Sequence, residues 1–275
     1  MRLGLEAGAH TLDVAAEQNV VGVPISAEQL VTTGVQATLA PLRERGLEVC
    51  QIGAFGFNPL SLDREGQARQ RQILEAAIPL AGETGCRYIV ICGGNYDPSG
   101  FGRAHPRNYR EEALDETARG LAPVVHLAER HGALISIEPY LKTAISTPER
   151  FLALKAKVGS DALRVNLDVT SFYGYWDMWD PLSSVQHTCA TLAGHYGLGH
   201  VKDVALQDGF HIHISLAPLS QGVTDWAATL RLMAPHLPED SWLILEHVQT
   251  AEEARTSLAY LRTAAREAGV ELNGS

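Results

Sequence analysis

The sequence predicts an α/β fold, a (β/α)8 TIM barrel in which residues 1–275 form a single domain. Short aliphatic runs alternate with amphipathic segments along the whole chain, which is the order expected of parallel strands joined by helices. Eight such runs occur in 275 residues, so the repeat averages about 34 residues, as expected of an eight-unit barrel. A doubly wound open sheet is the main alternative, but no GxGxxG motif follows the first run.

The predicted strands are rich in Val, Ile and Leu, which is typical of parallel strands covered on both faces. They span Leu3–Leu5, Val20–Ile25, Leu47–Ile52, Arg87–Cys92, Ala133–Ile137, Leu163–Leu167, Leu198–Val201 and Trp242–Leu245. A short helix is expected at about residues 10–19, and longer ones at Ala27–Arg45, Arg64–Gly82, Arg110–Arg130, Pro148–Val158, Asp225–Leu237 and Ala251–Ala268. After the seventh strand, His211 and His213 alternate as in an arm of a β-hairpin, and we expect neither to bind a metal.

The composition excludes several classes of function. The formal net charge is −10, which disfavours binding to nucleic acid or to an anionic membrane. The apolar runs are far shorter than the ~20 residues that a membrane span needs, and the first residues do not resemble a signal peptide. The four cysteines form no CxxC pair, so we expect them to be reduced and buried. We therefore expect a cytoplasmic protein with a small-molecule partner.

Polar residues stand at the ends of four consecutive predicted strands. Glu138 ends the fifth strand, Asp168 the sixth and Glu246 the eighth, and His200 lies on the seventh. In a TIM barrel the catalytic groups lie at the carboxyl ends of the strands, so these four side chains should meet at one mouth. Each alone would more often be a helix cap or a buried structural residue.

Three carboxylates that converge without a positive charge would repel one another strongly. A divalent cation would remove this repulsion, so the cluster predicts one bound metal ion. Oxygen ligands with a single imidazole suit Mn²⁺, which we prefer, and Mg²⁺, Co²⁺ or Fe²⁺; Zn²⁺ is a further alternative.

Several short motifs follow these strands in order. They are Ile137-Glu138-Pro139, Ser146-Thr147-Pro148-Glu149, Asn166-Leu167-Asp168-Val169, His200-Val201-Lys202-Asp203, Pro218 to Trp226, and Leu245-Glu246-His247. With these motifs the chain resembles the xylose isomerase-like sugar phosphate isomerase/epimerase superfamily of TIM barrels. The resemblance implies that Glu138, Asp168, His200 and Glu246 bind the metal. It also implies that Glu138 and Glu246 are catalytic, one taking the proton next to a carbonyl and the other returning it.

Two positions depart from the tagatose-type epimerases of that superfamily. Ser171 stands where those enzymes usually carry a second histidine, and Leu206 where they carry an arginine. The H-x-K-D form is favoured by other branches, which include inosose dehydratases. The apurinic endonucleases of the same fold need further histidines, which 53–57 and 93–96 do not supply.

Three more residues are expected to bind substrate. Lys202 shares a face with His200 and should hold a substrate oxygen or form an ion pair with Glu138 or Asp168. Glu6 ends the first strand and should line the far side of the pocket. His105, or Arg103, lies in a long glycine-rich loop that could close over the substrate as a lid; an ordinary solvated loop is the alternative.

These features favour a metal-dependent sugar isomerase or epimerase that moves a proton α to a carbonyl through an enediolate. A lyase or dehydratase acting on a keto-cyclitol or a 3-keto-glycoside is the alternative, because it begins with the same proton abstraction. A metal-binding barrel without turnover is the third hypothesis. The substrate is expected to be a small sugar or polyol. The aromatic loop 172–179 could form a subunit interface or a lid, or stack directly on a sugar, and the resemblance implies a homo-oligomer.

Overall fold

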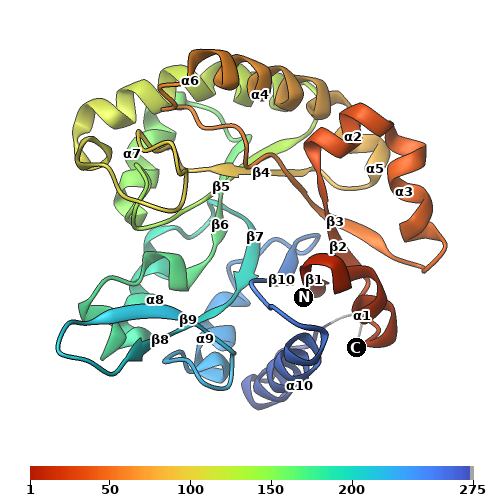
Figure 1. Ribbon diagram of the computed structural model, residues 1–275, viewed down its shortest axis with the longest axis vertical. Coiled ribbons are helices and arrows are strands. Elements are labelled where there is room, and N and C mark those ends of the chain that lie inside the picture. The colour runs from red at the N-terminus through yellow and green to blue at the C-terminus, as the bar shows by residue number, and fades with distance from the viewer. Residues whose placement is uncertain (273–275) are drawn as a thin grey trace.

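Eight parallel strands close into a barrel (Figure 1). The computed structural model describes residues 1–272, and within them the order around the barrel is β1-β10-β7-β6-β5-β4-β3-β2. The barrel strands are β1 Arg2–Leu5, β2 Gly22–Ser26, β3 Glu48–Gly53, β4 Tyr88–Cys92, β5 Leu134–Glu138, β6 Leu163–Leu167, β7 Tyr196–Val201 and β10 Trp242–Leu245. The predicted (β/α)8 architecture is confirmed, and every predicted strand overlaps an observed one.

The helices surround the barrel (Figure 1). They are α1 Thr11–Glu17, α2 Ala27–Thr33, α3 Val35–Arg43, α4 Arg64–Ala77, α5 Ala81–Thr84, α6 Glu111–Arg130, α7 Pro148–Val158, α8 Pro181–Thr191, α9 Trp226–Met233 and α10 Ala251–Ala268. Short 3₁₀ turns lie at η1 Gly8–His10, η2 Ile78–Leu80, η3 Pro106–Tyr109, η4 Val169–Phe172 and η5 Trp176–Met178. None of these helices in residues 1–272 is long and apolar enough to cross a membrane.

Three predicted helix boundaries were wrong. The helix predicted over 27–45 is two helices, because Gly34 adopts φ 80° and breaks the hydrogen-bond ladder between α2 and α3. The helix predicted over 64–82 ends at Ala77, before Pro79, whose ring and missing N–H do not fit a helix interior. The helix predicted over 225–237 ends at Met233. Helix α8 was not predicted at all; it buries few side chains and so has a weak apolar stripe.

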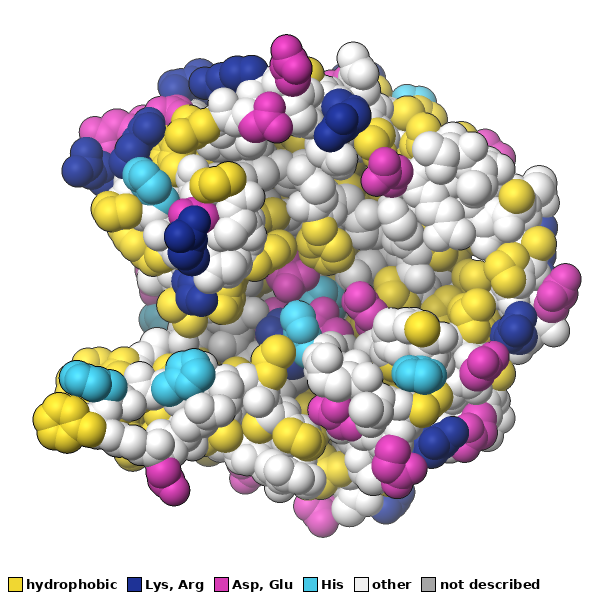
Figure 2. All heavy atoms as spheres, in the orientation of Figure 1, with side chains coloured by type: hydrophobic (Ala, Val, Ile, Leu, Met, Phe, Trp, Pro, Cys, Tyr) yellow, Lys and Arg dark blue, Asp and Glu magenta, His cyan; other side chains and the backbone are white. Residues whose placement is uncertain are grey.

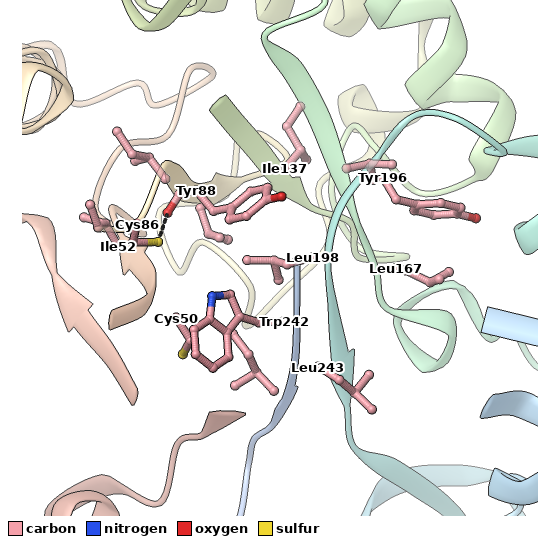
Figure 3. Packing of buried hydrophobic residues seen from close by; sticks show 14 of the residues in the cluster. Cys50, Ile52, Cys86, Tyr88, Ile137, Leu167, Tyr196, Leu198, Trp242 and Leu243 are labelled. Atoms are coloured by element: carbon pink, nitrogen blue, oxygen red, sulfur yellow. Dashed lines mark hydrogen bonds between the residues drawn. The ribbon is translucent and has the colours of Figure 1, made fainter. Parts of the chain in front are cut away.

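A large buried ring, that of Trp242, lies at the amino-terminal end of the barrel. Trp242 on β10 lies beside Cys50 (Figure 3), and the guanidinium carbon of Arg2 is 3.8 Å from the centre of the indole. A Cβ atom on Gly22 would lie 2.4 Å from the same indole, so only glycine leaves room for it there. The apolar packing at this end leaves the opposite, carboxyl end of the strands for polar residues.

The long segment after β7 forms an antiparallel hairpin, β8 Asp203–Gln207 and β9 His213–Ala217. It extends from the barrel at the lower left of Figure 1. The predicted hairpin arm is therefore present, with His213 on β9 and His211 in the connecting turn. The four cysteines are free and buried, as expected.

Candidate functional site

The four predicted ligands converge at the carboxyl ends of neighbouring strands. Glu138 ends β5, Asp168 follows β6, His200 lies on β7 and Glu246 follows β10. One ligand atom from each residue lies within 4.8 Å of the others, and all four side chains are buried. Strands β5, β6, β7 and β10 are consecutive around the barrel, so residues separated by more than a hundred positions meet at one point.

The orientation of His200 suits a metal ligand. Its Nε2 lies 2.9 Å from the side-chain carbonyl Oε1 of Gln51, which can only accept a hydrogen bond, and 3.4 Å from Nδ2 of Asn166; the shorter contact favours the proton on Nε2. Its Nδ1 faces the carboxylates, 3.2 Å from Oε2 of Glu246 and 3.7 Å from Oε2 of Glu138, and offers them a lone pair when the ring is neutral. This buried Nδ1 has no hydrogen-bond partner. Because Gln51 holds the ring at Nε2, Nδ1 remains available to bind a divalent cation. Such ions bind imidazole nitrogens and carboxylate oxygens at about 2.0–2.2 Å.

Lys202 lies among the carboxylates. Its Nζ donates to Oδ2 of Asp168 and to Oε1 of Glu246, the latter at 2.6 Å. Lys202 therefore pairs with Asp168, one of the two partners expected, and with Glu246. It also lines the pocket, and its contact with a substrate oxygen stays a prediction. With all three carboxylates ionised and His200 neutral, as metal binding requires, the negative charges of Glu138, Asp168 and Glu246 exceed the single positive charge of Lys202 by two. One divalent cation would bring the sum to zero.

Burial and neighbouring charges shift the pKa values of the two glutamates in opposite directions. Burial, with Glu246 nearby, raises the pKa of Glu138 to about 8. Burial also opposes ionisation of Glu246, but His200 and Lys202 outweigh it and hold the pKa of Glu246 well below its usual range. Burial disfavours the charged form of His200, yet Glu246 and Glu138 raise the pKa of His200 to about 9. The two glutamates therefore differ in protonation at neutral pH.

A polar layer supports the ligands from inside the barrel. Besides Gln51, it contains Ser136 and Asn166, whose side chains share a hydrogen bond of 2.5 Å from Oγ to Oδ1. All three are buried. They were not among the predicted site residues. Their signal is the strand period of two, since Ser136 and Asn166 stand two positions before Glu138 and Asp168 and so face the same way.

The H-x-K-D motif continues into a second network that anchors the hairpin. Asp203 is buried and accepts hydrogen bonds from Nε1 of Trp226 at 3.0 Å and from Oγ1 of Thr224 at 2.8 Å. Burial raises the pKa of Asp203 to about 6, and these donors moderate the rise. A Cβ on Gly222 would lie 2.0 Å from Cγ of Asp203, so glycine is needed beside this carboxyl. The network fixes the chain that follows Lys202.

A pocket of about 670 Å³ opens above the cluster and is lined by Glu6, Glu138, Lys202, Glu246 and His247, among others. Figure 2 shows the hollow, with charged and histidine side chains at its bottom and hydrophobic side chains on its walls. Burial, followed by the charge of Glu246, raises the pKa of Glu6. His247 was missed by sequence analysis. It adopts φ 59°, which is uncommon for a residue other than glycine and turns the chain directly after Glu246.

The structure does not bring His105 into this pocket. Its Nδ1 accepts the backbone N–H of Arg107 at 3.2 Å, and its ring lies against Tyr96. The Arg103 side chain lies 3.5 Å from Asp97. The base of the loop is fixed by buried Asn95 and its hydrogen bonds. Of this loop, only Phe101 lines the pocket.

Some aromatic residues of the loop after β6 line the pocket, and others lie on the surface. Tyr173 and Tyr175 line the pocket, whereas Trp176 and Trp179 are 80% and 56% exposed. Ser171 also lines the pocket and donates a hydrogen bond of 2.7 Å to Oδ2 of Asp168. At the position where tagatose-type epimerases carry a histidine, this chain thus has a short side chain held by Asp168.

Comparison with known proteins gives a family and a fold. The sequence model of a family described as "Xylose isomerase-like TIM barrel" matches residues 2–264, and no curated protein matches the chain. Among solved structures, the chain is similar to 3-keto-D-glucoside 4-epimerase from E. coli, with 16% identity and a TM-score of 0.72. The match covers 96% of this chain and 99% of the epimerase. It is also similar to the probable 3-DHS dehydratase AsbF from Bacillus anthracis, with 17% identity and a TM-score of 0.71. This match covers 95% of this chain and 99% of the dehydratase. A third similar structure is a xylose isomerase-like TIM barrel protein from Mycobacterium smegmatis in complex with magnesium, with 17% identity and a TM-score of 0.70. This match covers 93% of this chain and 88% of that protein.

Proposed function

The chain belongs to the xylose isomerase-like TIM barrel family, and from this premise we propose that it is a divalent-metal-dependent sugar isomerase or epimerase. The observation that carries the proposal is the convergence of Glu138, Asp168, His200 and Glu246 at the bottom of the pocket, with ligand atoms within 4.8 Å of one another. Sugar epimerases of the same fold support the proposed class of reaction.

In the proposed reaction, one glutamate takes the proton next to the substrate carbonyl and the other returns a proton from the opposite side. Glu246 is suited to be the base, because His200 and Lys202 keep its pKa low and its carboxylate ionised. Glu138 is suited to be the acid, because burial raises its pKa to about 8. Paired carboxyl groups whose pKa values are pushed apart commonly divide these two roles. The reverse reaction exchanges them.

The four ligands would hold one ion, for which Mn²⁺ is our preferred candidate and Mg²⁺, Co²⁺, Fe²⁺ or Zn²⁺ are alternatives. When bound, the ion would polarise the carbonyl and stabilise the negative charge of the enediolate. Lys202, buried and aimed at the same carboxylates, would keep them oriented and could donate a hydrogen bond to a substrate oxygen. Glu6 would contact a hydroxyl from the far wall of the pocket. His105, which lies outside the pocket, would bind substrate only if its loop moved.

Deuterium exchange tests the proposal. Purified protein with Mn²⁺ is incubated in heavy water with ketoses, keto-cyclitols and 3-keto-glycosides, and the products are analysed by mass spectrometry. Label in an isomeric sugar is the expected result. A product that has lost water or an aglycone would instead support the alternative, a lyase or dehydratase, which a dehydratase of the same fold makes reasonable. Metal binding without exchange in any compound would favour a non-catalytic metal-binding barrel.

We also propose that the protein is a cytoplasmic homo-oligomer. Free, buried cysteines suit a reducing compartment. Tyr175, Trp176 and Trp179 form an exposed aromatic cluster, with ring centroids 4.8 Å apart for the first pair, and such clusters are typical of subunit interfaces. Light scattering of the wild type and of Trp176→Ala would test this, since a monomeric wild type contradicts it.

A further inference from the structure

The pocket is larger than a simple sugar requires. Its volume is about 670 Å³. Even at the roughly 30 Å³ that a water molecule occupies in the liquid, the dozen or so non-hydrogen atoms of a hexose would fill only about half of this space. Glu6, Lys202 and His247, polar groups that could recognise hydroxyls, lie around the metal ligands. Other polar residues also line the pocket: Lys142, Thr170, Ser171, His213 and Ser215. The remaining space has room for another part of the substrate.

One wall of that remaining space is a row of three aromatic rings, Phe55, Phe101 and Tyr140. They follow three successive barrel strands, β3, β4 and β5. The centroids of Phe55 and Phe101 are 6.3 Å apart, and those of Phe101 and Tyr140 are 6.0 Å apart. All three line the pocket, and Phe55 remains 38% exposed. We refer to these three residues as the ring row.

A second wall is the apolar face of the β8–β9 hairpin, formed by Val204, Ile212, Ile214 and Leu216. Ile212 and Leu216 are 40% and 49% exposed. In Figures 1 and 2 the hairpin and the loop after β4 lie on different sides of the hollow. Aliphatic side chains offer no hydrogen bonds to sugar hydroxyls, so a second polyol unit would lose its hydration here without compensation.

We propose that this pocket binds glycosides, with the sugar at the polar bottom and an apolar, preferably aromatic, aglycone between the ring row and the hairpin. The proposal rests on the proposed function only for the position of the reacting sugar. It is supported by the continuity of the apolar walls with the ligand cluster in one cavity. Exposed apolar walls inside a concave site are typical of ligand-binding grooves. Phe55 and Leu216 are thereby assigned as specificity-determining residues.

Calorimetry with matched pairs of unreacted ligands tests this. The methyl and phenyl glycosides of glucose, galactose and their 3-keto forms are titrated into the full-length protein, with Mn²⁺ and again with EDTA. Burial of the phenyl ring should make at least one phenyl glycoside about 10- to 100-fold tighter than its methyl partner. The ratio should persist in EDTA, because the two walls do not include the metal ligands. If no phenyl compound in the panel exceeds its methyl partner, the proposal is wrong.

Variants then locate the binding surface. Phe55→Ala and Leu216→Ser should each reduce the phenyl-to-methyl ratio of affinities several-fold. Phe210→Ser is the matched control, since Phe210 lies on the same hairpin, is 96% exposed and does not line the pocket. A ratio that survives both wall variants would overturn the assignment. Failure of deuterium exchange with the phenyl preference intact would count against the proposed reaction only, whereas exchange without this preference would count against the aglycone site only.

Discussion

The Nε2 atom of His200 lies 2.9 Å from Oε1 of Gln51, and this contact determines which nitrogen faces the carboxylates. Gln51 comes from β3, on the opposite part of the barrel from β7. Because an amide oxygen can only accept, the neutral imidazole keeps its one proton on the nitrogen that faces Gln51. The metal-binding competence of His200 therefore depends on a residue 149 positions away in the chain.

Replacing Gln51 should weaken metal binding without removing a ligand. Gln51→Leu keeps the approximate size of the side chain but leaves the Nε2–H of His200 unpaired and its ring free to turn. Loss of such a supporting partner typically costs 10- to 100-fold in metal affinity, and we expect about that loss for Mn²⁺ by calorimetry. Gln51→Glu should recover most of the affinity, because a carboxylate also accepts this hydrogen bond. Equal affinities in all three proteins would contradict this role.

Glu246→Gln should separate binding from turnover. The amide can still offer one oxygen to a cation but cannot take a proton, so deuterium exchange should fall by about 10²–10⁴-fold while Mn²⁺ binding is only weakened. Glu129→Gln, an exposed change on α6, is the control and should leave both unchanged. Exchange at the wild-type rate in Glu246→Gln would remove Glu246 from the proposed mechanism.

Metal affinity should rise with pH. The pKa of Glu138 is raised to about 8 and the pKa of His200 to about 9, so at pH 7 both carry protons that a cation must displace. Apparent Mn²⁺ affinity should therefore increase about 10- to 100-fold per pH unit up to about pH 8, and then less steeply towards pH 9. Titrations in two buffers of different ionisation enthalpy would count the protons released. An affinity that is flat from pH 6 to pH 9 would refute this.

Gly222→Ala should destabilise the protein. The new Cβ would lie 2.0 Å from Cγ of Asp203, which must then move away from Thr224 and Trp226. Such overpacking costs about 1–3 kcal/mol, measurable as a lower midpoint of urea denaturation. Gly82→Ala is the matched control, because no atom lies within 4 Å of a Cβ at that position on α5. It should be neutral or slightly stabilising, and equal effects of the two changes would argue against the Asp203 network.

Local patterns in the sequence were enough to predict the barrel and the strand that carries each candidate ligand. Parallel strands buried on both faces have short aliphatic runs, and the topology of the barrel then brings their carboxyl ends together. The convergence of Glu138, Asp168, His200 and Glu246 follows from this rule and needs no knowledge of side-chain contacts. Helix ends were less predictable, as the break at Gly34 shows, because a glycine inside an amphipathic segment does not by itself signal φ 80°.

What only the tertiary structure decided is the set of contacts between residues far apart in the chain. In the sequence, Gln51 is an ordinary strand residue. Its contact with His200 exists only because β3 and β7 face each other across the closed barrel. The ion-pair partners of Lys202, Asp168 and Glu246, likewise became visible only in the closed barrel. His105 stands in a loop at the correct end of the barrel, yet its ring turns to Tyr96. Periodicity fixes which face of a strand a residue occupies, whereas the partner it meets depends on the closure of the whole barrel.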